Sequence, residues 1–367
     1  MIKRKDGRYQ DQIKLDGMTT TKYFYGKTQR EVKQKMAVWT AESRAGSLFA
    51  DSADSWDNVH TENVAYNTAA AYVAPLKRAK AHFKDRRMKD ITPDEIQAFI
   101  RELAGKDYAR RTVQMHLDML NMIFDHAITQ PGSIIKANPC TSVRIPSGLK
   151  QTRRKPPEDD QLEKIKAERQ ADFWLFAYFL LYTGLRRGEL LALRWENIDR
   201  KEKTIHVLNS VYYEGNQPKL KPPKSDAGTR DIVLLDVLAD VLPPKKKKGY
   251  VFGGEKPLSK TQVRKQWLSY CRAVDLAEKT ETVRKGRNNR EYKTTKWIAL
   301  VTPHQFRHAF ATMLYDADID ESAAQTLMGH ASIVVTKDIY THIKQRRKDE
   351  AAQKLNAFVN GSVESKT

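Results

Sequence analysis

The spacing of hydrophobic positions changes along the chain and predicts three structural regions followed by a tail. In residues 1–26, YQDQIKL and TTKYFY alternate apolar and polar residues, which is typical of strands, and Asp16-Gly17 and Tyr25-Gly26 mark tight turns. TQREVKQKMAVWTAES then predicts a helix. We expect a small ββ(β)α unit over residues 1–52, followed by the polar stretch ADSADSWDN.

From about Ser55 to Asn138 the apolar positions recur at helical spacing, as in NVAYNTAAAYVAPLKRAKAHF. Thr92-Pro93-Asp94-Glu95 predicts a helix start, because it combines an N-cap, a proline at the first helical position and an acid three residues after the cap. RRTVQMHLDMLNMIFDHAI predicts a helix whose apolar stripe faces a core: Val113, Leu117, Leu120 and Phe124, widened by Met119, Met122 and Ile123. We expect an all-helical domain over residues 54–143.

Residues 158–345 mix helical and strand patterns. DDQLEKIKAER and FWLFAYFLLY predict helices, and RRGELLALRWENI predicts another after the break at Thr183-Gly184-Leu185. TIHVLNSVYY, PKLKPPKS and TRDIVLL alternate like strands, with EGNQ and SDAG as turns. VTPHQFRHAFATML and ESAAQTLMGHAS predict two more helices. The expected fold is multidomain α+β, with a mainly helical third domain, a small antiparallel sheet, and a short tail helix within residues 346–367.

The net charge of the chain indicates the class of its partner. Lys and Arg number 65 against 45 Asp and Glu, a net charge of +20, and the pI is about 9.7, so the expected partner is a polyanion. FWLFAYFLLY is about half the ~20 residues of a spanning helix, and no apolar stretch follows MIKRKDGRY, which argues against a membrane partner and a signal peptide. Cys140 and Cys271 show no metal-ligand spacing. We expect a soluble protein of the cytoplasm.

Two basic segments are candidates for contact with a nucleic acid. Residues 1–50 carry a net charge of +6, and VRIPSGLKQTRRKPPED suggests a flexible basic connector, residues 144–157, that lets two domains close around a duplex. A solvated surface is the alternative for both segments. The candidate DNA-binding residues are Lys3, Arg4, Lys5, Arg8, Lys22, Arg153, Arg154 and Lys155.

Charged and protic residues of the last half suggest phosphoryl transfer. They are Arg186, Lys224, His304, Arg307, His330 and Tyr340. Arginine, lysine and histidine side chains can hold and neutralise a phosphodiester, and a tyrosine can attack it. Arg186 stands at a predicted helix start, which favours anions, and Glu189 lies one turn further on the same face. The spacing of His304 and His308 would suit zinc, but Gln305 stands where H-E-x-x-H requires glutamate, so we expect no metal and no cofactor.

Order and flanking residues of this set, in TGLRRGELLAL, KPPKSDAGTRDIVLL, TPHQFRHAFAT, LMGHAS and DIYTHI, resemble the tyrosine recombinase (phage integrase) family over roughly residues 155–345. The resemblance implies Arg186 and Arg307 as phosphate-binding arginines, Lys224 as the β-hairpin lysine, Glu189 as the helix acid and Tyr340 as the nucleophile. It also implies an arm-binding domain over residues 1–52 and a core-binding domain after it. The rivals for these roles are Arg187 for the first arginine, Lys219 and Lys221 for the lysine, and Tyr315 and Tyr292 for the nucleophile.

The resemblance implies a site-specific DNA recombinase that forms a 3′-phosphotyrosine without metal or ATP and integrates or excises a phage or transposon. Its partners would be core-type and arm-type sites on double-stranded DNA, further copies of itself in a tetramer, and an excisionase or a host DNA-bending protein, with no membrane. Three alternatives stay open from the residues: a type IB topoisomerase, a non-catalytic architectural protein, and a metal-dependent nuclease.

Overall fold

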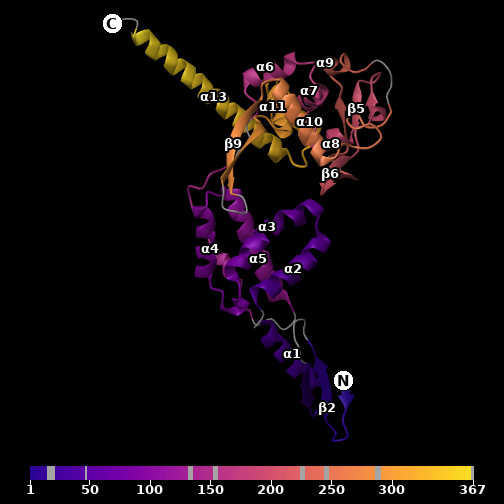
Figure 1. Ribbon diagram of the computed structural model, residues 1–367, viewed down its shortest axis with the longest axis vertical. Coiled ribbons are helices and arrows are strands. Elements are labelled where there is room, and N and C mark those ends of the chain that lie inside the picture. The colour runs from indigo at the N-terminus through magenta and orange to yellow at the C-terminus, as the bar shows by residue number, and fades with distance from the viewer. Residues whose placement is uncertain are drawn as a thin grey trace. The chain divides into compact units, whose positions relative to one another are not determined.

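The computed structural model describes residues 1–14, 21–45, 48–130, 135–151, 156–223, 228–243, 248–285 and 291–364. The chain divides into two compact units, Met1–Arg153 and Arg154–Thr367, and each is described by itself. The observed elements confirm the predicted α+β class: helices dominate and the sheets are small and antiparallel (Figure 1).

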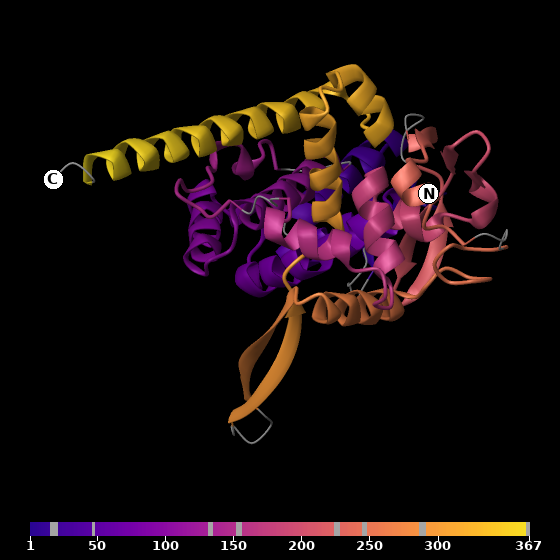
Figure 2. The same ribbon diagram turned by 90° about the horizontal axis from the view of Figure 1, so that it is seen from above.

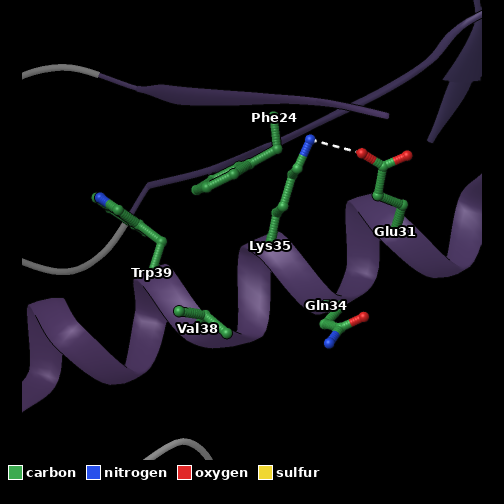
Figure 3. Close-up of a pocket in the computed structure, with 6 residues that line it drawn as sticks. All are labelled: Phe24, Glu31, Gln34, Lys35, Val38 and Trp39. Carbon is green, nitrogen blue, oxygen red and sulfur yellow. Dashed lines mark hydrogen bonds and ion pairs between the residues drawn. The ribbon is translucent and has the colours of Figure 1, made fainter. Parts of the chain in front are cut away.

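The first unit begins with a three-stranded antiparallel sheet in the order β1-β2-β3, followed by a helix. Its elements are β1 (Ile2–Lys3), β2 (Tyr9–Ile13), β3 (Lys22–Gly26) and α1 (Gln29–Ala45). Phe24 of β3 is buried and meets Trp39 of α1 edge to face, with ring centroids 5.4 Å apart. Figure 3 shows these two rings beside Val38 and the Lys35–Glu31 ion pair, around an open apolar hollow. The predicted ββ(β)α unit is therefore confirmed.

A helical bundle makes up the rest of the first unit. Its helices are α2 (Phe49–Asn63), α3 (Tyr66–Phe83), α4 (Pro93–Gly105) and α5 (Arg110–Thr129), with short 3-10 turns η1 (Met88–Asp90) and η2 (Pro139–Ser142). The Thr92 cap forms as expected: its main-chain N–H donates to Glu95 Oε2 (2.9 Å), and its hydroxyl accepts from the Glu95 N–H (3.3 Å). The predicted α5 stripe is buried in the bundle core, with Met122 at its margin.

Two stretches that were expected to connect domains are parts of this bundle. ADSADSWDN lies in α2, where Phe49, Ala53 and Trp56 are buried, because these apolar positions recur at helical spacing within a polar sequence. In VRIPSGLKQ, Arg144 exchanges two main-chain hydrogen bonds with the Gln97 side chain of α4, both 3.0 Å. Residues 144–151 are thus held on the bundle and are not a flexible connector; Arg153, Arg154 and Lys155 lie outside the described residues.

The second unit is built around α7 (Trp174–Thr183), whose side chains are buried on nearly all sides. Its other helical elements are α6 (Asp159–Ala167), α8 (Arg187–Ala192), the turn η3 (Trp195–Asn197), α9 (Asp236–Ala239), α10 (Lys260–Ala273), α11 (Pro303–Asp316), α12 (Glu321–Met328) and α13 (Ile333–Glu364). No helix in the described part of the chain is both long and apolar enough to span a bilayer. The two cysteines, Cys140 and Cys271, are buried and unlinked.

The strands of the second unit form two small sheets and a separate ribbon. Sheet β4-β5-β8 contains β4 (Ile198–Asp199), β5 (Thr204–Val207) and β8 (Arg230–Val233), and β6 (Ser210–Glu214) pairs with β7 (Gln217–Lys221). The expected hairpin between PKLKPPKS and TRDIVLL was wrong, since β7 and β8 pair with β6 and β5 instead. Pro222 and Pro223 have no N–H with which to continue a ladder. Lys224, expected at this hairpin tip, lies outside the described residues.

An antiparallel ribbon of β9 (Ala277–Lys285) and β10 (Glu291–Ala299) was not predicted. It projects from the end of α10 (Figure 2). Its described side chains are mostly exposed on both faces, so the sequence lacks the apolar alternation by which strands are recognised.

The tail also differs from the prediction. Instead of a separate short helix within residues 346–367, it is the second half of α13, which runs unbroken for 32 residues (Figure 1). No proline or glycine occurs between Ile333 and Gly361, so nothing in the sequence ends the helix after Tyr340.

Candidate functional site

Three arginines from separate segments of the second unit meet at the C-terminal end of α12. Three consecutive main-chain carbonyls each accept a hydrogen bond from one of them: Leu327 from Arg230 Nε (3.2 Å), Met328 from Arg307 Nη2, and Gly329 from Arg186 Nη2 (3.1 Å). Carbonyls at a helix C-terminus carry the negative end of the helix dipole and attract cations. We call Arg186, Arg230 and Arg307 the arginine cluster.

Arg186 is the most accessible member of the cluster. It precedes α8, after the turn at Gly184, and its side chain is 44% exposed. Glu189, one turn on, holds it twice: Oε1 accepts from Arg186 Nη1 (2.7 Å) and Oε2 from the Arg186 N–H (3.0 Å). The predicted Arg186–Glu189 pairing is thus present. Arg187, the rival, is the exposed first residue of α8.

Arg307 is buried, with 5% of its surface exposed. From α11 it donates Nη1 to the Gly184 carbonyl (2.7 Å) and Nη2 to the Met328 carbonyl. Gly184 must be glycine here, because its φ is +61° and a Cβ would lie 2.2 Å from the Phe310 ring. Burial and the neighbouring Arg186 cation lower the pKa of Arg307 to about 9, although the Glu189 carboxylate acts in the opposite direction.

His330 follows Gly329 directly and lies among these cations. It is 6% exposed, and its Nδ1 is 2.9 Å from the Thr336 hydroxyl. Burial, and then the positive charges of Arg307 and Arg186, lower its pKa to about 4. The imidazole is therefore neutral near pH 7, able to donate or accept a hydrogen bond without adding charge.

His304 lies at the start of α11 and is exposed. The predicted start forms: both the main-chain N–H and the hydroxyl of Thr302 donate to Gln305 Oε1, at 2.8 and 3.0 Å. This places His304 on α11 one turn before Arg307, with its ring centroid 5.1 Å from that of His308. In the described part of the chain, no group of three or more His, Cys, Asp or Glu side chains could hold a metal ion.

Tyr340 is buried and bonded to a main-chain carbonyl. It is 7% exposed, packs with Phe310 and Leu314 of α11, and donates its hydroxyl to the Ile319 carbonyl (3.1 Å). Burial, and then the charge of Asp320, raise the pKa of its phenol to about 12. The described structure therefore brings Arg186, Glu189, Arg307 and His330 together, while the expected nucleophile bonds to a separate main-chain group.

Arg230 is the member of the cluster that the sequence analysis missed. Its side chain is 5% exposed and its Nη2 lies 3.1 Å from Glu189 Oε2. One signal was available: in TRDIVLL the strand period of two puts Arg230 on the same face as Ile232 and Leu234, both of which the structure buries. An arginine in a buried position is rare unless it is paired.

The predicted DNA-binding residues of the first unit are exposed on or beside its small sheet. The Arg4 guanidinium lies over the Tyr25 ring, 5.2 Å from its centroid, and Arg8 pairs with Asp6 at 2.8 Å. Lys22 is the first residue of β3 and is in register with Ile13, the last residue of β2. Lys3 and Lys5 are exposed near the N-terminus.

Positive charge exceeds negative charge at the C-terminal end of α12. The arginine cluster carries three positive charges, and among the described residues Glu189 is the carboxylate paired with it. Burial alone would raise the pKa of Glu189, but the Arg230 and Arg186 cations outweigh it and keep this pKa below its ordinary value. Two positive charges remain in a site that is buried around Arg230 and Arg307 and open at Arg186. Such a site favours a bound anion, above all one that gains negative charge during reaction.

Sequence comparisons agree with this chemistry. Residues 158–347 match the profile of the phage integrase family, and residues 53–133 match the phage integrase N-terminal SAM-like domain. A tyrosine recombinase XerC-like protein of Caldanaerobacter subterraneus is 26% identical over 386 residues, covering 93% of each chain. The ICEBs1 integrase of Bacillus subtilis is 27% identical over 285 residues, covering 76% of this chain and 74% of its own.

Solved structures share the fold. The Tn1549 transposon integrase in complex with transposon right end DNA matches with a TM-score of 0.60 at 18% identity, covering 83% of this chain and 100% of that one. A lambda integrase dimer bound to a COC′ core site matches with a TM-score of 0.55 at 18% identity, covering 79% and 94% of the two chains.

Proposed function

The chain belongs to the phage integrase family, and from this we propose that it recombines DNA through Tyr340, with the arginine cluster binding the scissile phosphate. It is a tyrosine site-specific recombinase, an enzyme that integrates mobile DNA.

In the proposed reaction, the Tyr340 oxygen attacks the phosphorus of one phosphodiester. The new P–O bond makes a 3′-phosphotyrosine, the bond to the 5′-oxygen breaks, and that oxygen leaves with a proton from Lys224. Arg186 and Arg307 stabilise the pentacoordinate state, which carries about two negative charges. His330 hydrogen-bonds a non-bridging oxygen and His304 assists removal of the phenol proton. Because the ester conserves the bond energy, a 5′-hydroxyl of another strand can reverse the step without ATP.

The single observation that carries this proposal is the excess of two positive charges in the arginine cluster, of which Arg230 and Arg307 are buried. A phosphodiester would neutralise one of them and the transition state both, so the site matches the transition state better than the ground state. Arg186, with 44% of its side chain exposed, offers the side from which a DNA phosphate could enter.

Catalysis on this scheme requires Tyr340 to leave the Ile319 carbonyl. Its raised pKa makes the phenol a poor nucleophile in the DNA-free protein, and the neighbouring carboxylates of Asp320 and Glu321 contribute to this rise. We infer that DNA binding and neighbouring protomers release the first turns of α13, which carry Tyr340.

We further propose how DNA and other copies engage the chain. The helical bundle and the second unit would bind a core-type site, and the basic ββ(β)α unit an arm-type site. Four protomers would assemble on two core sites in a bacterial cytoplasm, with an excisionase or a DNA-bending host protein setting direction. A type IB topoisomerase would need no second DNA sequence, so binding of the N-terminal unit to a distinct site separates the two functions.

The direct test uses a nicked duplex that carries the element's core site, from which the 5′-hydroxyl strand is lost after cleavage. Wild type should accumulate a covalent protein–DNA adduct in EDTA, and mapping the adducted residue should give Tyr340. Absence of any adduct would favour a binding-only architectural protein, and loss of cleavage in EDTA would favour a metal-dependent nuclease.

A further inference from the structure

Arg230 engages all three of its guanidinium nitrogens within the protein. Nε donates to the Leu327 carbonyl (3.2 Å), Nη1 to the Gly228 carbonyl (3.3 Å) and Nη2 to Glu189 Oε2 (3.1 Å). These partners belong to α12, the turn before β8, and α8. One planar side chain therefore fixes three segments that are distant in sequence.

This arrangement distinguishes Arg230 from the phosphate-binding arginines. With all three nitrogens engaged and 5% of the side chain exposed, it presents no free edge to a DNA phosphate. Arg186, by contrast, is 44% exposed. Arg230 and Arg186 share one carboxylate, because Glu189 binds Arg230 through Oε2 and Arg186 Nη1 through Oε1. The orientation of Arg186 thus depends on a carboxylate that Arg230 holds from the other side.

Gly329 completes the arrangement. It adopts a left-handed φ of +62°, and a Cβ there would lie 2.7 Å from Arg230 Cζ. The guanidinium is packed directly against the main chain of the residue that accepts from Arg186 and precedes His330. Any larger residue at position 329 would displace the guanidinium or the helix end.

We propose that Arg230 is a positioning residue of the recombinase. It fixes the orientation of the Glu189 carboxylate, and through it that of the Arg186 side chain, relative to His330 and the C-terminal end of α12. The proposal rests on the proposed function, since it assumes that Arg186 binds the scissile phosphate. A buried ion pair could instead serve fold stability alone. The two roles differ in a measurable way: a positioning residue acts through Glu189, so its effect on cleavage should not add to that of a Glu189 variant.

The test measures single-turnover cleavage of the nicked core-site duplex by full-length Arg230→Lys, Glu189→Gln and the double variant, with DNA affinity and thermal midpoint for each. Arg230→Lys keeps the charge but loses the planar three-way contact, and we expect cleavage to slow about tenfold or more with affinity changed less than about twofold. The double variant should be no slower than the slower single variant. Arg194→Lys is the matched control, because Arg194 is an exposed arginine paired with Glu196 in the same unit.

Two results would overturn the positioning role. One is cleavage by Arg230→Lys at the wild-type rate. The other is a double variant in which the two losses of cleavage rate multiply and the rates of the variants fall in parallel with their thermal midpoints. If Arg230→Lys fails to fold, Gly329→Ala provides a second variant, because its Cβ would displace the Arg230 guanidinium. It should slow cleavage as much as Arg230→Lys is expected to, and its effect should likewise not add to that of Glu189→Gln. The proposed nucleophile fails separately: a normal adduct from Tyr340→Phe would refute Tyr340, while the ratio of Arg230→Lys to wild-type adduct would still report on Arg230.

Discussion

The Tyr340 hydroxyl donates a hydrogen bond to the main-chain carbonyl of Ile319, at 3.1 Å. Ile319 lies in the connection between α11 and α12, so this bond ties the proposed nucleophile to the segment that leads into the helix on which the arginine cluster converges. Its net value is about 1 kcal/mol. That is small against the binding free energy of a DNA site, so release of Tyr340 on DNA is energetically accessible.

Replacing Tyr340 by phenylalanine should abolish covalent adduct formation and leave DNA affinity nearly unchanged. The change removes one oxygen, and the loss of the bond to Ile319 should lower the free energy of unfolding by about 1 kcal/mol. Adduct formation on the nicked duplex and gel-shift affinity measure the two effects. Tyr315→Phe is the control, because its ring packs edge to face on Tyr340 at 5.2 Å. Full adduct from Tyr340→Phe and none from Tyr315→Phe would move the nucleophile to Tyr315.

Arg186→Lys should reduce cleavage about 100-fold with little change in stability. A lysine keeps the charge but cannot bond Glu189, the Gly329 carbonyl and a phosphate in one plane. Arg187→Lys, on the adjacent exposed position, should cleave normally. Single-turnover rates and thermal midpoints check both. If Arg187→Lys loses cleavage and Arg186→Lys keeps it, the first arginine has been assigned to the wrong residue.

Arg307→Lys should lose cleavage and stability together. Arg307 is buried and satisfies the Gly184 and Met328 carbonyls with two different nitrogens, so a lysine would leave one carbonyl without its donor. An unsatisfied buried carbonyl costs about 1–3 kcal/mol, which denaturant unfolding can measure. An unchanged free energy of unfolding would show that the contacts of Arg307 do not stabilise the folded unit.

The features that the sequence predicted correctly depend on neighbours in the chain. The Thr92–Glu95 cap, the stripe of α5 and the break at Gly184 each involve residues within a few turns of one another. The pairing of Arg186 with Glu189 is equally local. Such features follow from backbone geometry and from the period of the helix, so one sequence suffices to predict them.

What could not be predicted depends on distant partners or on exposed residues. Arg230 contacts Glu189 and Leu327, which are 41 and 97 residues away, and no local pattern encodes these pairs. The position of Tyr340 is decided by packing against α11 and by Ile319, not by its spacing from His330. The described side chains of the β9–β10 ribbon are mostly exposed on both faces, so the strands show no hydrophobic period to detect.

His330 should make the second unit less stable in mild acid. Below pH 6.5 the imidazole of the unfolded chain gains a proton, whereas native His330 gains it only near pH 4. The unfolded state then binds more protons, so stability falls as the pH drops through this window. Between pH 7 and 5, wild type should lose roughly 2 kcal/mol more than His330→Asn. Denaturant unfolding of both proteins at the two pH values tests this, and parallel losses would contradict it.

The N-terminal unit should be removable without loss of core-site cleavage. The cut belongs after residue 47, because Phe49 and Ala53 of α2 are buried in the bundle core and a cut at residue 52 would remove part of that helix. The 48–367 protein should cleave a core site at the full-length rate and lose binding to a second, distinct sequence. Footprinting of both proteins over the whole attachment region measures this. Identical footprints would refute an arm-binding role for residues 1–47.

The exposed end of α13 should act between protomers. Leu355 and Phe358 are 63% and 73% exposed and share one helix face with Ala351. Exposing such an apolar face to water is unfavourable unless a partner covers it. Glutamate at both positions 355 and 358 should leave folding and single-site cleavage unchanged, because both side chains are largely exposed to solvent. It should reduce synapsis and recombination by tenfold or more, since about 1.5–3 kcal/mol is lost for each large apolar side chain kept from burial.

Gln353→Glu, on the opposite face, is the matched control. Native gels of DNA complexes and recombination assays separate the steps: if the double variant still forms tetramers and recombines at the control rate, this face of α13 does not couple the protomers.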